Sequence, residues 1–200
     1  MKYTGQTEFR IDEYNWRNWP RILVLLILIL LNCAVGVAGL FYDDLWPDFS
    51  LIVENVKDGE YYRLLTSMFI HADEVHLFLN MAALFGLGRI LERVTGHIKF
   101  LIIYVCSGLC GGLMVMYIEE EGVMTGGASG AVFGLLGAML VYMLVNGDYS
   151  MITSAFLMLV IEVSSTFLSE GISIGGHIGG LIGGLVFGML LIRRKKTLEY

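Results

Sequence analysis

One serine and one histidine stand out because each lies among small residues in an otherwise apolar stretch. Ser129 lies in the segment TGGASGA and His177 in GGHIGG. A serine hydroxyl becomes a nucleophile when a neutral imidazole takes its proton, and the oxyanion formed in acyl transfer needs hydrogen-bond donors. Asn80 and His76, four residues apart on one helix face, can donate, as can the backbone N–H of Ser129. These residues predict acyl transfer by a serine–histidine pair.

The composition places this chemistry in a membrane. Of the 200 residues, 56% are hydrophobic and 16% are charged, whereas soluble domains carry roughly 25% charged residues. Ionisable or strongly polar side chains at membrane depth are rare and usually functional. The three cysteines lie in apolar runs and indicate neither a disulfide framework nor a zinc site.

Six apolar segments are near the ~20 residues that a bilayer demands. They are Ile22–Phe41, His76–Glu92, Lys99–Ile118, Ser129–Val145, Met151–Leu168 and Ile174–Ile192. The first exceeds the ~7–15-residue core of a signal peptide, which favours a signal anchor. We therefore expect an all-α membrane protein, a bundle of six transmembrane helices. A long connection, residues 42–75 between the first two, is expected at the membrane interface because it carries several aromatic residues.

Basic residues are distributed unevenly between the two sides of this arrangement. Eleven of the thirteen Lys and Arg residues share a side with both termini, and only Lys57 and Arg63 fall on the other. The positive-inside rule then predicts a multi-pass protein of the cell membrane with cytoplasmic N- and C-termini. The expected organisation is a short cytoplasmic segment 1–20, a six-helix domain 21–194 and a basic tail 195–200.

Counting along the expected helices brings the polar residues to one depth. At 1.5 Å per residue, Ser129, His177 and His76 each lie roughly 25 Å above the cytoplasmic face, with Asn80 about 6 Å lower. This layer is near the outer boundary of a ~30 Å core, and residues 122–128 are expected to dip inward. Small residues four apart let helices approach closely. Such ridges occur at Gly126, Gly130 and Gly134 and at Gly176, Gly180, Gly184 and Gly188. Tight packing alone explains the glycines, but not a serine and a histidine at matching depth.

At these positions the sequence resembles the rhomboid family of intramembrane serine proteases. Gly127-Ala128-Ser129-Gly130 is similar to the family's G-x-S-G nucleophile motif, and His177 to its general base. The segment HADEVHLFLN, residues 71–80, resembles its H-x4-H-x3-N segment. Residues 63–72 and the GRILE of residues 88–92 match flanking segments. The resemblance covers roughly residues 20–194. Tyr62 stands where the family often has Trp.

The resemblance implies an intramembrane serine endopeptidase that cleaves transmembrane helices near the outer membrane face through an acyl-enzyme. Ser129 and His177 would form the catalytic dyad, and His76 and Asn80 would support the oxyanion. The supporting residues would be Phe133, whose ring packs on the histidine, Gly127 and Gly130. The expected partners are single-pass transmembrane substrates and the lipid bilayer, with a gate at the fifth span and a cap around Ser169–Ile174. No cofactor, metal or nucleic acid is expected.

Other interpretations are weaker. A metal site of His71, His76 and His177 lacks an H-E-x-x-H motif and a carboxylate trio, and His71 more plausibly braces the long connection. Loss of the serine or the histidine would favour a second interpretation, a catalytically inactive relative that binds transmembrane helices. Both residues are present. A small transporter would show an inverted repeat. Glu162 in the fifth span stays open: it could line a water cavity, hydrogen-bond within the bundle or be protonated in the gate helix.

Overall fold

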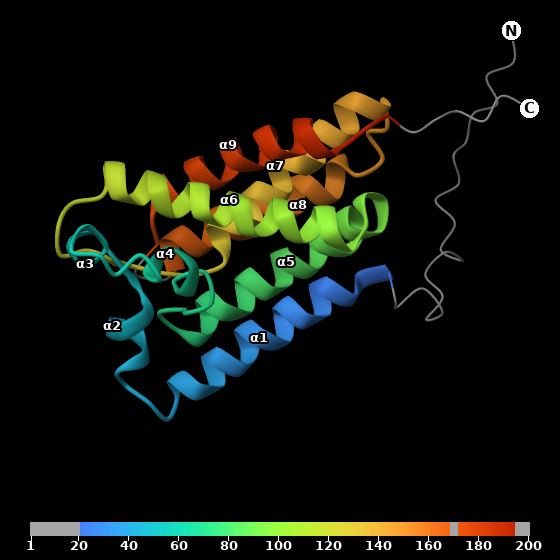
Figure 1. The fold of residues 1–200 in the computed structure, drawn as a ribbon. Coiled ribbons are helices and arrows are strands. Elements are labelled where there is room, and N and C mark those ends of the chain that lie inside the picture. Colours follow the sequence, from blue (N-terminus) through green and yellow to red (C-terminus); the bar gives the residue numbers. More distant parts are fainter. Residues whose placement is uncertain (1–20, 169–171, 195–200) are drawn as a thin grey trace, which may run out of the picture.

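The computed structural model describes residues 21–168 and 172–194 and is almost entirely helical (Figure 1). Along this part of the chain the elements are α1 (Leu23–Gly39), α2 (Leu45–Phe49), β1 (Leu51–Ile52), α3 (Val53–Lys57), α4 (Arg63–Thr66), α5 (Glu74–Thr95), α6 (His97–Ile118), β2 (Met124–Thr125), α7 (Ser129–Asn146), α8 (Ile152–Leu168) and α9 (Ile174–Leu191). The expected segments 1–20 and 195–200 lie outside the described residues, as do residues 169–171 of the expected cap.

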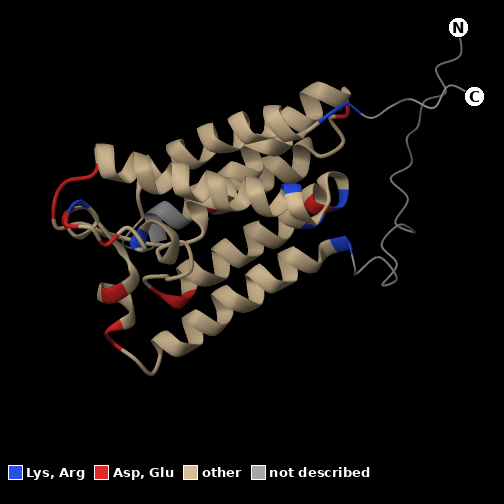
Figure 2. Cartoon of the chain, viewed as in Figure 1, with Lys and Arg blue, Asp and Glu red and all other residues tan. Residues whose placement is uncertain are grey.

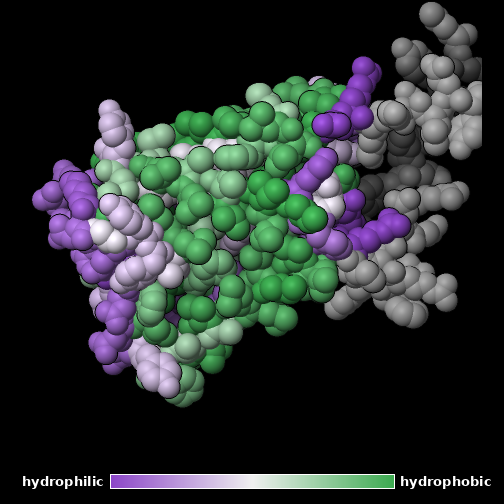
Figure 3. Space-filling model, in the orientation of Figure 1, coloured by the Kyte–Doolittle hydropathy of each residue, from purple (hydrophilic) through white to green (hydrophobic). Residues whose placement is uncertain are grey.

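Within residues 21–168 and 172–194, four helices are long and apolar enough to cross a bilayer, namely α5, α6, α7 and α9. Helix α1 and residues Ile152–Ser164 of α8 are apolar but shorter. The face of the bundle seen in Figure 3 is a broad apolar belt with hydrophilic residues at its two ends. The chain is therefore a multi-pass, mainly helical membrane protein, as the composition predicted, while the count of six spanning helices stays a prediction.

Helix α9 packs against both α6 and α7, which also contact each other. Helix α1 lies along α5, and α8 packs mainly against α5 (Figure 1).

Glycines make the α7–α9 contact possible. A methyl group added at Gly180 would lie 1.9 Å from the carbonyl oxygen of Gly130, and one at Gly184 would lie 1.9 Å from that of Gly134. Two backbones touch there, as the four-residue glycine spacing predicts.

A buried carboxylate ties α1 to α5. Glu92, which is 1% exposed, accepts hydrogen bonds from the backbone N–H groups of Val24 at 2.9 Å and Leu25 at 2.8 Å. Its other contact is the ring Nδ1 of His97 at 2.5 Å. The first N–H groups of a helix have no partner inside the helix and favour a negative charge. Glu92, from the GRILE segment, therefore caps the start of α1.

The connection between α1 and α5 is folded. Arg63 is 4% exposed and donates to the carbonyl oxygens of Pro47 and Ser50, each at 2.8 Å. Strand β1 pairs antiparallel with β2, so that Leu51 lies opposite Thr125. This pairing attaches the connection to the segment that leads into α7. Its expected location at the membrane interface stays a prediction.

Candidate active site

Ser129 and His177 are brought together by the contact between α7 and α9. Ser129 is the first residue of α7, and His177 lies in the first turn of α9. Their side chains meet, with 3.0 Å between His177 Nε2 and Ser129 Oγ. Both residues are 7% exposed. This is hydrogen-bond distance for transfer of the hydroxyl proton to the ring, and it agrees with the common depth expected from the sequence.

Phe133 orients the imidazole. It lies one turn after Ser129 on α7, and its ring stacks on that of His177 with 4.3 Å between ring centroids and 20° between ring planes. Stacked aromatic rings resist rotation because turning either ring loses contact area. The imidazole is thus held between the Phe133 ring on one side and the Ser129 hydroxyl at its edge.

The backbone ahead of Ser129 has a shape that requires glycine. Gly127 has a φ of +122°, a region that residues with a Cβ rarely adopt. A methyl group there would also lie 2.8 Å from Cε1 and Nε2 of His76. The Gly127 N–H donates to the Ser67 carbonyl oxygen at 2.8 Å. Since Thr125 is 5% and Ala128 0% exposed, the part of this segment next to Ser129 packs inside the protein, whereas residues 122–124 are exposed. The inward dip expected for residues 122–128 stays a prediction.

His71 holds the same segment. Its Nε2 accepts a hydrogen bond from the Ala128 N–H at 3.3 Å. His71 therefore joins the long connection, in which it lies, to the backbone immediately before Ser129. Burial and, secondarily, the nearby His76 lower the pKa of His71 to about 3. The ring is therefore neutral at physiological pH and keeps the lone pair that accepts this bond.

His76 and Asn80 are both 0% exposed on α5. The His76 ring lies against Gly127 and meets the ring of His71 edge-on, with 5.1 Å between centroids. The Asn80 side chain donates to the His76 carbonyl oxygen at 3.0 Å. That bond uses one of the two N–H groups of the amide. His76 therefore lies beside the segment before Ser129. The side-chain hydrogen bond of Asn80, in contrast, is made within its own helix α5.

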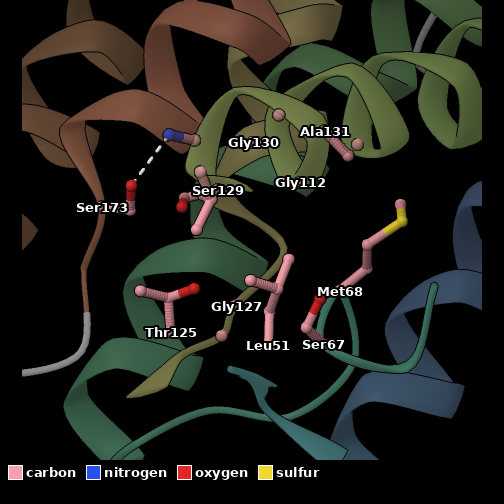
Figure 4. A pocket seen from close by; sticks show the side chains of 15 residues that line it. Leu51, Ser67, Met68, Gly112, Thr125, Gly127, Ser129, Gly130, Ala131 and Ser173 are labelled. Carbon is pink, nitrogen blue, oxygen red and sulfur yellow. Dashed lines mark hydrogen bonds between the residues drawn. The ribbon is translucent and has the colours of Figure 1, made fainter. Parts of the chain in front are cut away.

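A cavity of about 40 Å³ lies beside Ser129 (Figure 4). The hydroxyl-bearing residues Ser67, Thr125 and Ser173 line it together with Gly127 and other glycines. A water molecule needs roughly 10–15 Å³ of such volume and polar partners. The cavity has room for about three or four waters next to the nucleophile, and a hydrolytic step requires one.

Two residues near the site were missed by sequence reasoning. Ser173 caps α9 by accepting from the Gly176 N–H at 3.0 Å, and its hydroxyl donates to Glu119 at 2.5 Å. A serine directly before an apolar, glycine-rich run is a recognisable N-cap signal. Nothing in the sequence indicates a role for Glu119, because it reaches Ser173 only when the fold brings the end of α6 to the start of α9.

Among the described residues, no group of three or more His, Cys, Asp or Glu side chains could hold a metal ion. The three histidines considered as ligands have other neighbours: His71 contacts Ala128, His76 lies against Gly127, and His177 contacts Ser129. The arrangement is suited to nucleophilic chemistry, with a hydroxyl, an adjacent base and a water-sized cavity in one place.

Comparison with known proteins agrees with this geometry. A family model described as the Rhomboid domain matches residues 58–194. RHOMBOID-like protein 7 of Arabidopsis thaliana is 29% identical over 168 residues, which are 67% of this chain and 52% of that protein. Rhomboid protease GluP of Bacillus subtilis is 38% identical over 91 residues, 46% of this chain and 18% of that protein.

A third relative shows that similarity alone does not establish activity. It is Inactive RHOMBOID-like protein 8 of Arabidopsis thaliana, 36% identical over 85 residues, 42% of this chain and 24% of that protein. The chain spans about half the length of these relatives or less. The family model nevertheless covers more than half of the chain and includes both Ser129 and His177. The chain belongs to the rhomboid family.

Proposed function

We propose that this protein is an intramembrane serine endopeptidase that cleaves single-pass transmembrane proteins near the outer face of the cell membrane. The observation that carries the proposal is the 3.0 Å contact between Ser129 Oγ and His177 Nε2 inside a bundle of membrane helices. A serine that served only helix packing would not require a histidine at this distance, nor an aromatic ring stacked on that histidine.

The reaction would proceed in two steps. In the first, His177 takes the proton of Ser129 as the serine oxygen attacks the carbonyl carbon of the scissile peptide bond. His76, Asn80 and the Ser129 backbone N–H donate to the resulting oxyanion. His177 then gives the proton to the leaving amine, and an acyl-enzyme remains. In the second step, water from the cavity attacks the ester, with His177 again taking and returning a proton.

We infer six membrane-crossing helices with both termini in the cytoplasm. Lys and Arg gather mainly at one end of the bundle, where α5 meets α6, and acidic residues mainly at the other (Figure 2). Basic residues favour the cytoplasmic side. Since Ser129 and His177 lie at the ends of α7 and α9 away from the basic cluster, substrates would be cut near the outer face. A substrate helix would partly unwind there and enter past α8.

The decisive experiment is cleavage of a model transmembrane substrate by the purified protein in liposomes. We expect Ser129→Ala and His177→Ala to abolish cleavage and Asn80→Ala to reduce its rate by up to about 10²–10³-fold. Ser150→Ala is the matched control because Ser150 is exposed in the turn between α7 and α8, where its hydroxyl donates to Asp148 at 2.7 Å. Equal cleavage by the wild type and the Ser129 variant would refute the proposal.

A fluorophosphonate probe distinguishes a protease from a protein that only binds transmembrane helices, the function that an inactive relative suggests. The probe should label the wild type at Ser129 and should not label the Ser129→Ala variant. If the wild type binds a substrate helix but neither cleaves it nor reacts with the probe, the binding function replaces the proposed one.

A further inference from the structure

The start of α9 is fastened to the end of α6 by two side chains. The Ser173 hydroxyl donates to Glu119 Oε1 at 2.5 Å and accepts from the Gly176 N–H at 3.0 Å. Ser173 is 8% exposed, and Glu119 is half-buried at the point where α6 ends. One hydroxyl thus serves as helix cap and as a bond between two helices. A hydrogen bond to a carboxylate is shorter and stronger than one between neutral groups.

The turn that this bond secures is the one that carries His177. The His177 N–H donates to the Ser173 carbonyl oxygen at 3.2 Å, so Ser173 is one helical turn before the imidazole. Between them lie Gly175 and Gly176. Glycine is among the poorest helix formers because its backbone loses the most freedom on folding. A first turn with two glycines is weakly helical by itself and depends on outside contacts.

The glycines themselves have a reason to be there. The Gly176 carbonyl oxygen lies 2.8 Å from where a methyl group at Gly111 would be and 3.2 Å from one at Gly130. The first turn of α9 therefore fits closely between α6 and α7. The glycines allow this close packing, but they also make the turn less stable as a helix. The hydrogen bond between Ser173 and Glu119 stabilises the turn by attaching it to α6. The Glu119 carboxylate also lies at the positive end of the α9 dipole, where a negative charge is stabilising.

We propose that Glu119 and Ser173 are positioning residues for the general base. They act by holding the first turn of α9, which keeps His177 Nε2 within reach of Ser129 Oγ, although Ser173 also borders the cavity beside Ser129. This inference rests on the proposed function, in which His177 is the base. It predicts that loss of the bond lowers kcat and leaves KM unchanged, because the group that is displaced takes part in proton transfer and not in binding.

Ser173→Asp separates the bond between helices from simple capping. Aspartate caps a helix as well as serine does, but it lacks the hydroxyl donor and places a second carboxylate against Glu119. We expect kcat to fall about tenfold or more, since misplacement of a catalytic group by about 1 Å can cost 10²-fold. Adding Glu119→Gln supplies an amide N–H that donates to the new aspartate, and we expect it to restore kcat to within about threefold. Glu120→Gln, at the exposed neighbouring position, is the control and should change nothing.

Hydrogen exchange at the Gly176 and His177 amides provides a measurement independent of activity. Protection should drop in Ser173→Asp and return in the double variant. The proposal is overturned if Ser173→Asp keeps wild-type kcat, if its protection is unchanged, or if Glu119→Gln does not restore it. A wild type that cleaves nothing would refute the proposed function. The exchange result would still decide whether the pair holds this turn.

Discussion

Gly180→Ala adds one methyl group at the contact between α7 and α9, close to the candidate active site. The added methyl carbon would lie 1.9 Å from the carbonyl oxygen of Gly130, 2.7 Å from its carbonyl carbon and 3.0 Å from its Cα. Ordinary contact begins at 3.4 Å, so the first of these distances is 1.5 Å too short. All three atoms belong to the backbone of α7, and no rotamer change can move them.

Relief therefore requires α9 to move away from α7. Gly130 directly follows Ser129, and Gly180 lies three residues after His177, so the displacement occurs at the reacting pair. A shift of about 1 Å would lengthen the 3.0 Å contact between His177 and Ser129 beyond hydrogen-bond distance. We expect kcat to fall about 10²-fold and the free energy of unfolding to drop by about 1–3 kcal/mol through overpacking.

The assay is cleavage of a model substrate in liposomes, combined with a thermal melt of each variant. Gly39→Ala at the end of α1 is the matched control, because among the described residues no atom beyond its chain neighbours and its own helix backbone lies within 4 Å of the methyl group it adds. It should match the wild type in both measurements. Wild-type cleavage and an unchanged melting temperature for Gly180→Ala would refute the idea that direct backbone contact sets the α7–α9 distance.

Two further outcomes are expected. Phe133→Leu should lower kcat about three- to tenfold without changing KM, because stacking on His177 contributes about 0.5–1.5 kcal/mol; a change in KM alone would contradict this. Since burial lowers the pKa of His71 to about 3 from about 6.5 when unfolded, the unfolded chain binds the extra proton as pH falls. Stability should therefore drop below about pH 6.5, by up to about 1.4 kcal/mol per pH unit. In melts at pH 7 to 4, His71→Gln, which can still accept from Ala128, should show a shallower decline, and equal slopes would exclude His71 as the source.

The helices themselves were largely predictable from the apolar runs. The fourth segment was expected at Ser129–Val145, and α7 is Ser129–Asn146; the sixth was expected at Ile174–Ile192, and α9 is Ile174–Leu191. The second helix begins earlier than expected, at Glu74, because Asp73 caps it by accepting from the His76 N–H at 2.7 Å. Hydropathy does not register a polar first turn, whereas the cap determines where the helix begins.

The candidate pair was predictable for a different reason. Helix geometry converts residue number into depth, so Ser129 and His177 could be matched before any contact was known. Helix geometry does not predict the hydrogen bonds that hold the site together. The bonds from Gly127 to Ser67, from Ala128 to His71 and from Ser173 to Glu119 each join segments more than 50 residues apart. No periodicity or spacing encodes them, and they depend on how the whole bundle packs.

The position of α9 between α6 and α7 also has a consequence for biosynthesis. Ribosomes make the chain from its N-terminus, so Ser129 enters the membrane well before His177 exists. Under the proposed function, Ser129 therefore has no base until α9 has been made and has packed beside α7. The catalytic pair would then form only when the last helix is in place, so that the order of synthesis itself would delay activity.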